Sequence, residues 1–234
     1  ELSAKASQGV EVRLMYDHMG NVALPKNFFN KLKKAGGKVC AFTPAFFIRL
    51  NYRNHRKIAV IDGKIGYVGG FNIGNEYLGL VKRFGYWRDT HVRFEGEVVD
   101  QLQLRFMMDW NFCYEEKFEI NSFYYPPKDI KNYLPAQVVS SGPDTRWHNI
   151  RNSYFKMINE AEKNIYVETP YFSPDDSIQE ALKIAALSGI DVRIIIPAHP
   201  DHLFVYWASM SYLGELLEAG VRCYQYENGF IHSK

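Results

Sequence analysis

The sequence has few of the features that mark disulfide-rich, membrane-spanning or nucleic-acid-coating proteins. Only 3 of 234 residues are cysteine, Cys40, Cys113 and Cys223, and no two form a CxxC pair. This usage favours free thiols in a reducing compartment over a disulfide framework. No charged-then-apolar leader opens the chain and no apolar run reaches about 18 residues, so we expect no membrane-spanning segment within it. The formal net charge of +2 supplies no basic surface for coating a nucleic acid.

Apolar and aromatic residues are plentiful, at 47% and 15% of the chain. They suffice for one large core or two small ones. Strand-like and helix-like patterns alternate along the chain, which predicts the α/β class. Asp62-Gly63 separates two strand-like runs and predicts a hairpin turn. We expect strands at 56–61, 64–70, 90–94 and 164–169, and helices at 97–112, at 150–162 and after Pro174.

Two stretches of the chain resemble each other. "QGVEVRLMYDHMG" begins at Gln8 and "SGIDVRIIIPAHP" at Ser188, and each precedes an amphipathic helix that ends in Ala-Gly. Each helix leads to a short strand and then, at similar spacing, to a histidine, His55 or His232. Matched order and spacing predict an internal duplication. The alternative is a chance likeness between two βαβ units, which are common and share their pattern.

The duplication predicts two lobes. The Pro-, Tyr- and charge-rich stretch 114–137 lacks periodicity and is interpreted as their connection. The first lobe then covers 1–113, without its N-terminal part, and the second covers 138–234 and ends inside the second copy of the motif. On this hypothesis the chain lacks strands of its second lobe. We therefore expect the isolated chain to have little or no enzymatic activity and to aggregate.

The segment "NHRKIAVIDGKIGYVGGFN" carries the residues suited to chemistry. His55 and Lys57 are two apart, so on a strand both point to the same face. Histidine can attack phosphorus or exchange protons near neutral pH, and lysine offers a point cation to a phosphoryl oxygen. One His-x-Lys in a strand is more often structural. The second copy in "GFIHSK", with His232 and Lys234, favours the catalytic interpretation.

Displacement at phosphorus needs an attacking group on one side and an acid on the other. Two pseudo-symmetric copies would supply both, so we expect the imidazoles of His55 and His232 to face one cleft at roughly 5–8 Å. After the first motif come Gly69, Gly70 and Asn72. The glycines permit close approach of backbone to a phosphate, and Asn72 offers an amide donor.

The pattern His55-x-Lys57-x4-Asp62, followed by the two glycines and the asparagine, resembles the HKD motif of the phospholipase D superfamily. The segments "WRDTHVRFEG", "ETPYFSPD" and "HPDHLFVYWASMSYLGELLEAGVRCYQYENGFIHSK" are similar to bacterial cardiolipin synthases. The resemblance implies two pseudo-symmetric α/β lobes with mixed sheets, the second truncated here. It implies no cofactor and no metal. It also implies a bacterial cell-membrane enzyme, anchored through segments outside this chain, that acts on phosphatidylglycerol and other anionic phospholipids.

The resemblance further implies a mechanism. His55 would attack the phosphorus of phosphatidylglycerol and form a phosphohistidine, while His232 protonates the departing glycerol. His232 would then deprotonate a second phosphatidylglycerol, whose attack yields cardiolipin.

The other motif residues receive supporting roles from the same resemblance. Lys57, Lys234 and Asn72 would hold phosphoryl oxygens, and Asp62 would tie the motif strands together. Asp89, which opens the strand "DTHVRF", is the candidate acid that orients the nucleophilic histidine; the alternative is a strand-end ion-pair partner.

Two other functions remain open. The same site could use water or a nucleic acid as a phospholipase D-type phosphodiesterase or nuclease, although the low net charge disfavours a nucleic acid partner. The chain could also be a non-catalytic lipid-binding module. Such a module needs only cations, so the intact His55, Lys57 and His232 argue against it.

Overall fold

A computed structural model describes residues 1–42, 53–130, 133–142 and 145–234. The chain forms two compact units. Unit 1 comprises Glu1–Tyr67 and Arg93–Val138, and unit 2 comprises Val68–Val92 and Val139–Lys234. Unit 2 thus includes residues 68–92, which the sequence analysis placed in the first lobe. Both units combine helices and strands, so the α/β class is confirmed.

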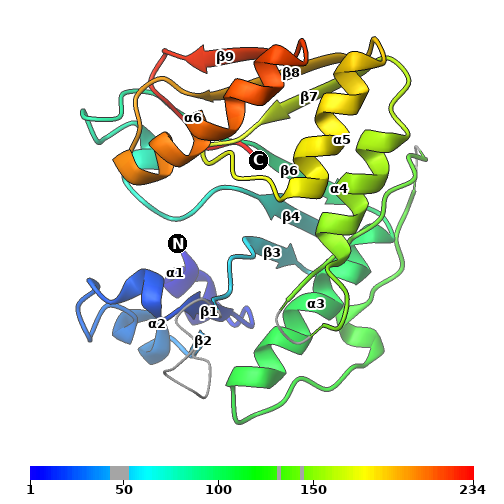
Figure 1. Cartoon of the computed structure of the whole chain (residues 1–234). Coiled ribbons are helices and arrows are strands. Elements are labelled where there is room, and N and C mark those ends of the chain that lie inside the picture. Colours follow the sequence, from blue (N-terminus) through cyan, green and yellow to red (C-terminus); the bar gives the residue numbers. More distant parts are fainter. Residues whose placement is uncertain (43–52, 131–132, 143–144) are drawn as a thin grey trace. The chain divides into compact units, whose positions relative to one another are not determined.

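Unit 1 begins with a βαβ arrangement (Figure 1, blue). Helix α1 (Leu2–Ser7) leads into β1 (Arg13–Asp17), and β2 (Lys38–Phe42) follows η1 (Met19–Asn21) and α2 (Asn30–Lys34). The strands β1 and β2 are parallel, with Arg13 opposite Lys38. A parallel pair needs a crossover connection, and α2 lies in it.

The rest of unit 1 is centred on a second sheet and a long helix. Strands β3 (Ile58–Ile61), β4 (Ile65–Gly69) and β6 (His91–Glu95) pair in the order β3-β4-β6. The predicted hairpin turn is present between β3 and β4, with φ of 53° at Asp62 and 63° at Gly63. These two left-handed residues are typical of a type I′ turn. The helix α3 (Val98–Cys113) buries Met107 and Trp110 against Cys40 of β2 and against Phe118.

Residues 114–137 lie largely outside regular structure, as expected. Within their described part, the short η3 (Ser122–Tyr124) interrupts the extended chain. Their proposed role as the connection between two duplicated lobes stays a prediction.

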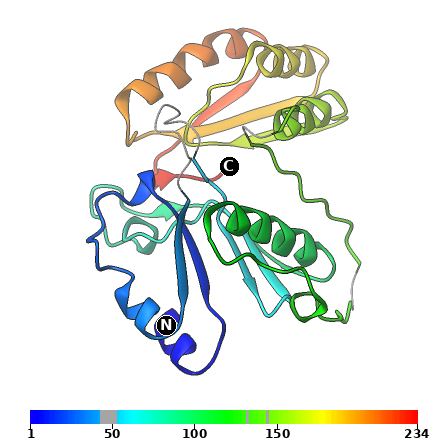
Figure 2. The ribbon, with the colours of Figure 1, turned by 90° about the horizontal axis from the view of Figure 1, so that it is seen from below.

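Unit 2 contains a parallel sheet in the order β7-β8-β9 (Figures 1 and 2). Its elements are α4 (Asn149–Asn159), β7 (Asn164–Glu168), α5 (Asp176–Leu187), β8 (Asp191–Pro197), α6 (Leu203–Glu218) and β9 (Arg222–Tyr226). The three helices cover one face of the sheet. Alternate residues of β8 (Val192, Ile194 and Ile196) are buried there with Leu182 of α5 and Leu216 of α6.

Two short segments complete unit 2. Strand β5 (Trp87–Arg88) follows η2 (Glu76–Leu78), and β10 (Phe230–Ile231) follows β9. The strands β5 and β10 are parallel, with Ile231 opposite Arg88. This pairing brings together Asp89 and His232, which are 143 positions apart in the chain. Each of the two residues directly follows its strand, β5 or β10.

The two similar sequence stretches have the same order of elements. Each runs strand, helix, strand, as β1-α2-β2 and β8-α6-β9, although α2 has 5 residues and α6 has 16. Both helices end at a left-handed glycine, Gly36 with φ 92° and Gly220 with φ 90°. The following amides bond back to Leu32 O at 3.0 Å and to Leu216 O at 2.9 Å, as in a Schellman motif.

None of the helices in the described part of the chain has the length and apolar character needed to cross a bilayer.

Candidate active site

His55 lies in an extended segment just before β3, and two carboxylates hold the residues around it. The amide of Asn54 donates to Asp17 Oδ2 at 3.1 Å, and its side-chain Nδ2 donates to Asp109 Oδ2 at 3.2 Å. On the other side of His55, Arg56 donates from NH1 to Asp109 Oδ2 at 3.1 Å. The chain is therefore anchored immediately before and immediately after the histidine, which itself has an exposed side chain.

Asp109 is buried in α3, with a side chain only 5% exposed. It also forms an ion pair with Arg105, one turn earlier on the same helix. Two guanidinium groups and an amide thus offset the cost of burying one carboxylate. The sequence analysis did not identify Asp109; the available signal was an acid among the apolar residues Met107 and Trp110.

The two His-x-Lys copies have the same local geometry. Lys57 Nζ donates to the carbonyl of His55 at 2.8 Å, and Lys234 Nζ donates to the carbonyl of His232 at 2.8 Å. Each lysine therefore turns back beside its own histidine. Asp62, by contrast, lies in the β3-β4 turn, at the other end of β3, with an exposed side chain. Its predicted role in tying strands together stays a prediction.

His232 has a buried carboxylate as its partner. Its Nδ1 lies 2.7 Å from Asp89 Oδ2, and the Asp89 side chain is 0% exposed. The other carboxylate oxygen accepts the Thr90 amide at 2.7 Å. Both oxygens are thus engaged, and the imidazole is held through Nδ1 so that Nε2 faces away from the acid.

This contact corrects the partner proposed for Asp89. The sequence analysis paired it with the nucleophilic histidine, His55, whereas the structure pairs it with His232. The reason is the parallel pairing of β5 with β10: Asp89 follows β5, His232 follows β10, and parallel strands end at the same edge. The amide of His232 donates to Arg88 O at 2.7 Å and extends this register.

The glycine pair makes room for this acid. A Cβ on Gly70 would lie 2.0 Å from Asp89 Oδ1, and a Cβ on Gly69 would lie 2.4 Å from the carbonyl oxygen of Thr90. The sequence analysis explained the glycines by close approach to a phosphate. The structure shows a packing reason as well, and their close approach to a phosphate stays a prediction.

Asn72 reaches His232 through a tyrosine. Asn72 Nδ2 donates to Tyr77 Oη at 2.8 Å, and Tyr77 Oη lies 3.4 Å from His232 Nδ1. Burial is the main cause that raises the pKa of Tyr77, partly offset by the hydrogen bond from Asn72. The tyrosine therefore stays a neutral hydroxyl beside the imidazole. The ring of Trp87 also lies beside the imidazole of His232, with 5.4 Å between the two ring centroids.

Lys234 places a cation beside the ring, with Nζ 3.1 Å from His232 Nδ1 and 3.2 Å from His232 Nε2. An anchored imidazole with a cation beside it can exchange a proton with a group on an anionic phosphoryl centre. Within the described residues, no three His, Cys, Asp or Glu side chains gather as metal ligands would. The metal-independent mechanism stays a prediction.

Comparisons with known proteins show the family of this chain. A family described as "Cardiolipin synthase, PLD-like domain" matches residues 1–110 and 154–234. Cardiolipin synthase of Listeria monocytogenes (serotype 4a, strain HCC23) is 52% identical over 238 residues. The major cardiolipin synthase ClsA of Bacillus subtilis (strain 168) is 52% identical over 242 residues. Both alignments cover 100% of this chain and 49% of the relative, so the chain spans about half the length of these relatives.

A solved structure shows the same fold. Phosphatidylserine synthase of Haemophilus influenzae Rd KW20 superposes with a TM-score of 0.64 at 14% identity, over 100% of this chain and 64% of that chain. The family match includes every motif residue considered above, from His55 through Asp89 to His232 and Lys234. The chain therefore belongs to the phospholipase D-like domain family of cardiolipin synthases.

Proposed function

We propose that this chain provides the catalytic residues of a phosphatidyltransferase that makes cardiolipin from two phosphatidylglycerol molecules and releases glycerol. The observation that carries the proposal is the pair of His232 and the buried Asp89, 2.7 Å apart, with the Lys234 ammonium beside the same imidazole. A module that only binds lipid headgroups needs cations, but it does not need an oriented imidazole with a buried carboxylate.

In the first step, a ring nitrogen of His55 attacks phosphorus. The phosphorus–nitrogen bond forms as the bond to the glycerol oxygen breaks, and His232 Nε2 gives its proton to that oxygen. Glycerol leaves, and the phosphatidyl group remains on His55. Asp89 holds the ring through Nδ1 and faces the positive charge of the protonated imidazole.

In the second step, His232 is neutral and acts as the base. Nε2 takes the proton of the terminal hydroxyl of a second phosphatidylglycerol, whose oxygen attacks phosphorus. The phosphorus–nitrogen bond breaks, cardiolipin leaves, and both histidines return to their first state. Water in place of the lipid hydroxyl would give phosphatidic acid instead.

The remaining motif residues support the charge that develops on phosphorus. Lys57 and Lys234 supply cations, and Asn72 supplies an amide donor near Tyr77. The proposed substrates, phosphatidylglycerol and other anionic phospholipids, place the reaction at a bacterial membrane surface. The proposal involves no metal, no other cofactor and no nucleic acid.

The test replaces the matching half of the Bacillus subtilis relative with this chain, which aligns with it over 242 residues. The chimera is reconstituted with labelled phosphatidylglycerol. We expect cardiolipin and glycerol in equal amounts, and we expect His55→Ala and His232→Ala to lose about 1,000-fold or more in rate. Glu160→Gln, which breaks an exposed ion pair with Lys156 on α4 outside the motif, is the control and should keep most of the activity.

The products separate the competing functions. Phosphatidic acid without cardiolipin would replace the transferase by a phospholipase. A folded chimera that binds lipid and yields neither product would leave the binding module as the function.

A further inference from the structure

The first turns of α6 expose large apolar side chains, whereas two leucines farther along the helix are buried. Leu203 is 66% exposed, Phe204 92% and Trp207 66%, whereas Leu213 and Leu216 are 4% and 0% exposed. Positions 204 and 207 are one turn apart, so their side chains lie on the same side of the helix. We call Leu203, Phe204 and Trp207 the α6 apolar surface. It costs free energy in water and has the composition of a contact surface.

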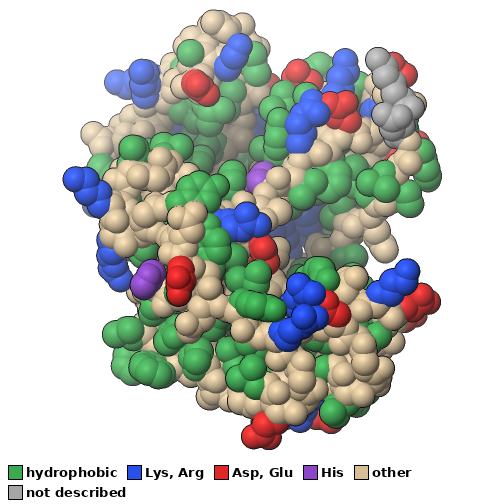
Figure 3. Space-filling view, turned by 90° about the horizontal axis from the view of Figure 1, so that it is seen from above, with side chains coloured by type: hydrophobic (Ala, Val, Ile, Leu, Met, Phe, Trp, Pro, Cys, Tyr) green, Lys and Arg blue, Asp and Glu red, His purple; other side chains and the backbone are tan. Residues whose placement is uncertain are grey.

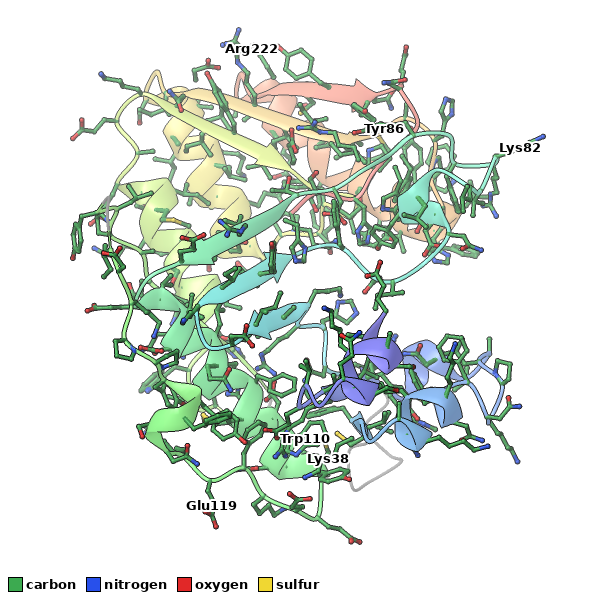
Figure 4. All side chains as sticks on the ribbon, turned by 180° about the vertical axis from the view of Figure 1, so that it is seen from behind. Lys38, Lys82, Tyr86, Trp110, Glu119 and Arg222 are labelled. Carbon is green, nitrogen blue, oxygen red and sulfur yellow. The ribbon has the colours of Figure 1, made fainter. Side chains whose placement is uncertain are left out.

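Basic side chains lie beside this surface. Arg83 NH2 donates to the carbonyl oxygen of Asp201 at 3.4 Å, which places the guanidinium two residues before the start of α6. Its neighbour Lys82 has an exposed side chain, and Figure 4 shows it reaching outward from its loop. The nearby Asp201 carboxylate accepts a hydrogen bond from Tyr171 and is only 15% exposed. The rim of the surface is therefore cationic.

We propose that the α6 apolar surface, with Lys82 and Arg83 at its rim, docks on an anionic lipid bilayer. Trp, Phe and Leu insert at the boundary between headgroups and acyl chains, and Lys and Arg pair with anionic headgroups outside it. On the face drawn in Figure 3, hydrophobic side chains are interspersed with Lys, Arg, Asp and Glu side chains. The choice of an anionic bilayer rests on the proposed function, whose substrate is an anionic phospholipid.

The consequence for the site follows from the chain path within unit 2. Helix α6 leads through β9 and β10 to His232, and all belong to one compact unit. A bilayer held at α6 therefore keeps His232 at a set height above the lipid surface. Docking would raise the rate with lipid in vesicles and leave the rate with a short-chain soluble analogue unchanged.

The experiment measures binding of the 234-residue chain to vesicles by flotation, without any turnover. Vesicles contain phosphatidylglycerol and phosphatidylcholine in equal parts, or phosphatidylcholine alone. The double variant Phe204→Ser/Trp207→Ser should bind the anionic vesicles about tenfold or more weakly. The matched control Phe123→Ser/Tyr133→Ser removes two aromatic side chains that are 76% and 85% exposed in unit 1, and should bind within about twofold of the parent.

A charge variant tests the rim separately. Lys82→Gln/Arg83→Gln should weaken binding to anionic vesicles about fivefold per charge at low salt and hardly at all at high salt. Binding to phosphatidylcholine alone should be weak for every variant. Thermal unfolding checks that each variant is folded. We expect little change in stability, because the substituted side chains are exposed.

Equal binding by the parent and by Phe204→Ser/Trp207→Ser would overturn the proposal. The proposal would also be overturned if this variant kept its vesicle binding but lost self-association. The α6 apolar surface would then contact a second copy of the chain and not a bilayer. Vesicle binding is read without catalysis, so a failed transferase assay leaves this result standing. If the chimera is active but Phe204→Ser/Trp207→Ser leaves vesicle binding unchanged, only the docking proposal is refuted.

Discussion

At the scale of single residues, the contact between Asp89 and His232 fixes the orientation of the His232 imidazole. The carboxylate lies 2.7 Å from Nδ1, and Lys234 Nζ lies 3.1 Å from Nδ1 and 3.2 Å from Nε2. An imidazole that is anchored at one nitrogen is suited to proton transfer through the other nitrogen.

Replacing Asp89 with Asn should therefore impair proton transfer most. We expect the transfer rate of the chimera to fall about 100- to 10,000-fold with phosphatidylglycerol. With a p-nitrophenyl phosphodiester, whose leaving group needs no protonation, release of nitrophenol should fall far less. Equal losses with both substrates would contradict the role of Asp89 as the partner of a general acid.

Gly70 offers a steric test of the same contact. Gly70→Ala would place a Cβ 2.0 Å from Asp89 Oδ1 and displace the carboxylate, so its kinetics should match those of Asp89→Asn. The control is Gly214→Ala in α6, where nothing lies within 4 Å of the added Cβ. Alanine should raise helix stability there and leave the rate unchanged.

Asp109 should support both the stability of unit 1 and the placement of His55. Asp109→Asn leaves Arg56 and Arg105 without their buried counter-charge, and should lower the free energy of unfolding by about 3 kcal/mol in urea titrations. The transfer rate should also fall under conditions where the variant is folded, since the segment around His55 loses an anchor. Glu160→Gln, which breaks an exposed ion pair with Lys156, should change stability by less than about 0.5 kcal/mol. An Asp109→Asn variant as stable as this control would refute the argument.

At the scale of secondary structure, the pairing of β5 with β10 builds the His232 site. Gly229 precedes β10 with φ of 94°, and a Cβ there would lie 2.1 Å from the carbonyl oxygen of Tyr86. That oxygen accepts the Phe230 amide at 2.9 Å, so the close approach begins the strand pair. The glycine of "GFIHSK" is thus part of the site although it has no side chain.

Gly229→Ala should separate β10 from β5 and abolish transfer, while the β7-β8-β9 sheet stays folded. Hydrogen exchange should show faster exchange of the Phe230 and His232 amides, with protection of β8 retained. Gly220→Ala has a similar φ of 90° but nothing within 4 Å of the added Cβ, so it should cost about 1 kcal/mol and keep activity. Full activity in Gly229→Ala would show that this strand pair is dispensable.

The elements also show what sequence patterns can predict. Strands β3, β4, β6 and β7 and helices α3, α4 and α5 lie where periodicity predicted them, because their apolar residues recur at the spacing of a strand or a helix. The partner of Asp89 was not predictable in this way, since it depends on pairing between segments 143 residues apart. Asp109 and Tyr77 were missed for a related reason: an acid or tyrosine in a helix shows its partner only after the chain has folded.

At the scale of the whole molecule, the chain supplies one His-x-Lys to each compact unit. His55 and Lys57 belong to unit 1, and His232 and Lys234 belong to unit 2. The same turn of each lysine onto its own histidine carbonyl, at 2.8 Å in both, supports a common origin of the two copies. The proposed reaction needs both units at one phosphoryl group, one for attack and one for proton transfer.

Identifying the histidine that becomes phosphorylated tests this division of roles most directly. The chimera is mixed with labelled phosphatidylglycerol, quenched in base to preserve phosphohistidine, and digested for mass spectrometry. We predict the phosphatidyl group on the peptide that contains His55, none on the peptide that contains His232, and no label in His55→Ala. His232→Ala should still label slowly with a good leaving group. Label on His232 with none on His55 would contradict the account, because the histidine paired with Asp89 would then be the nucleophile and not the acid.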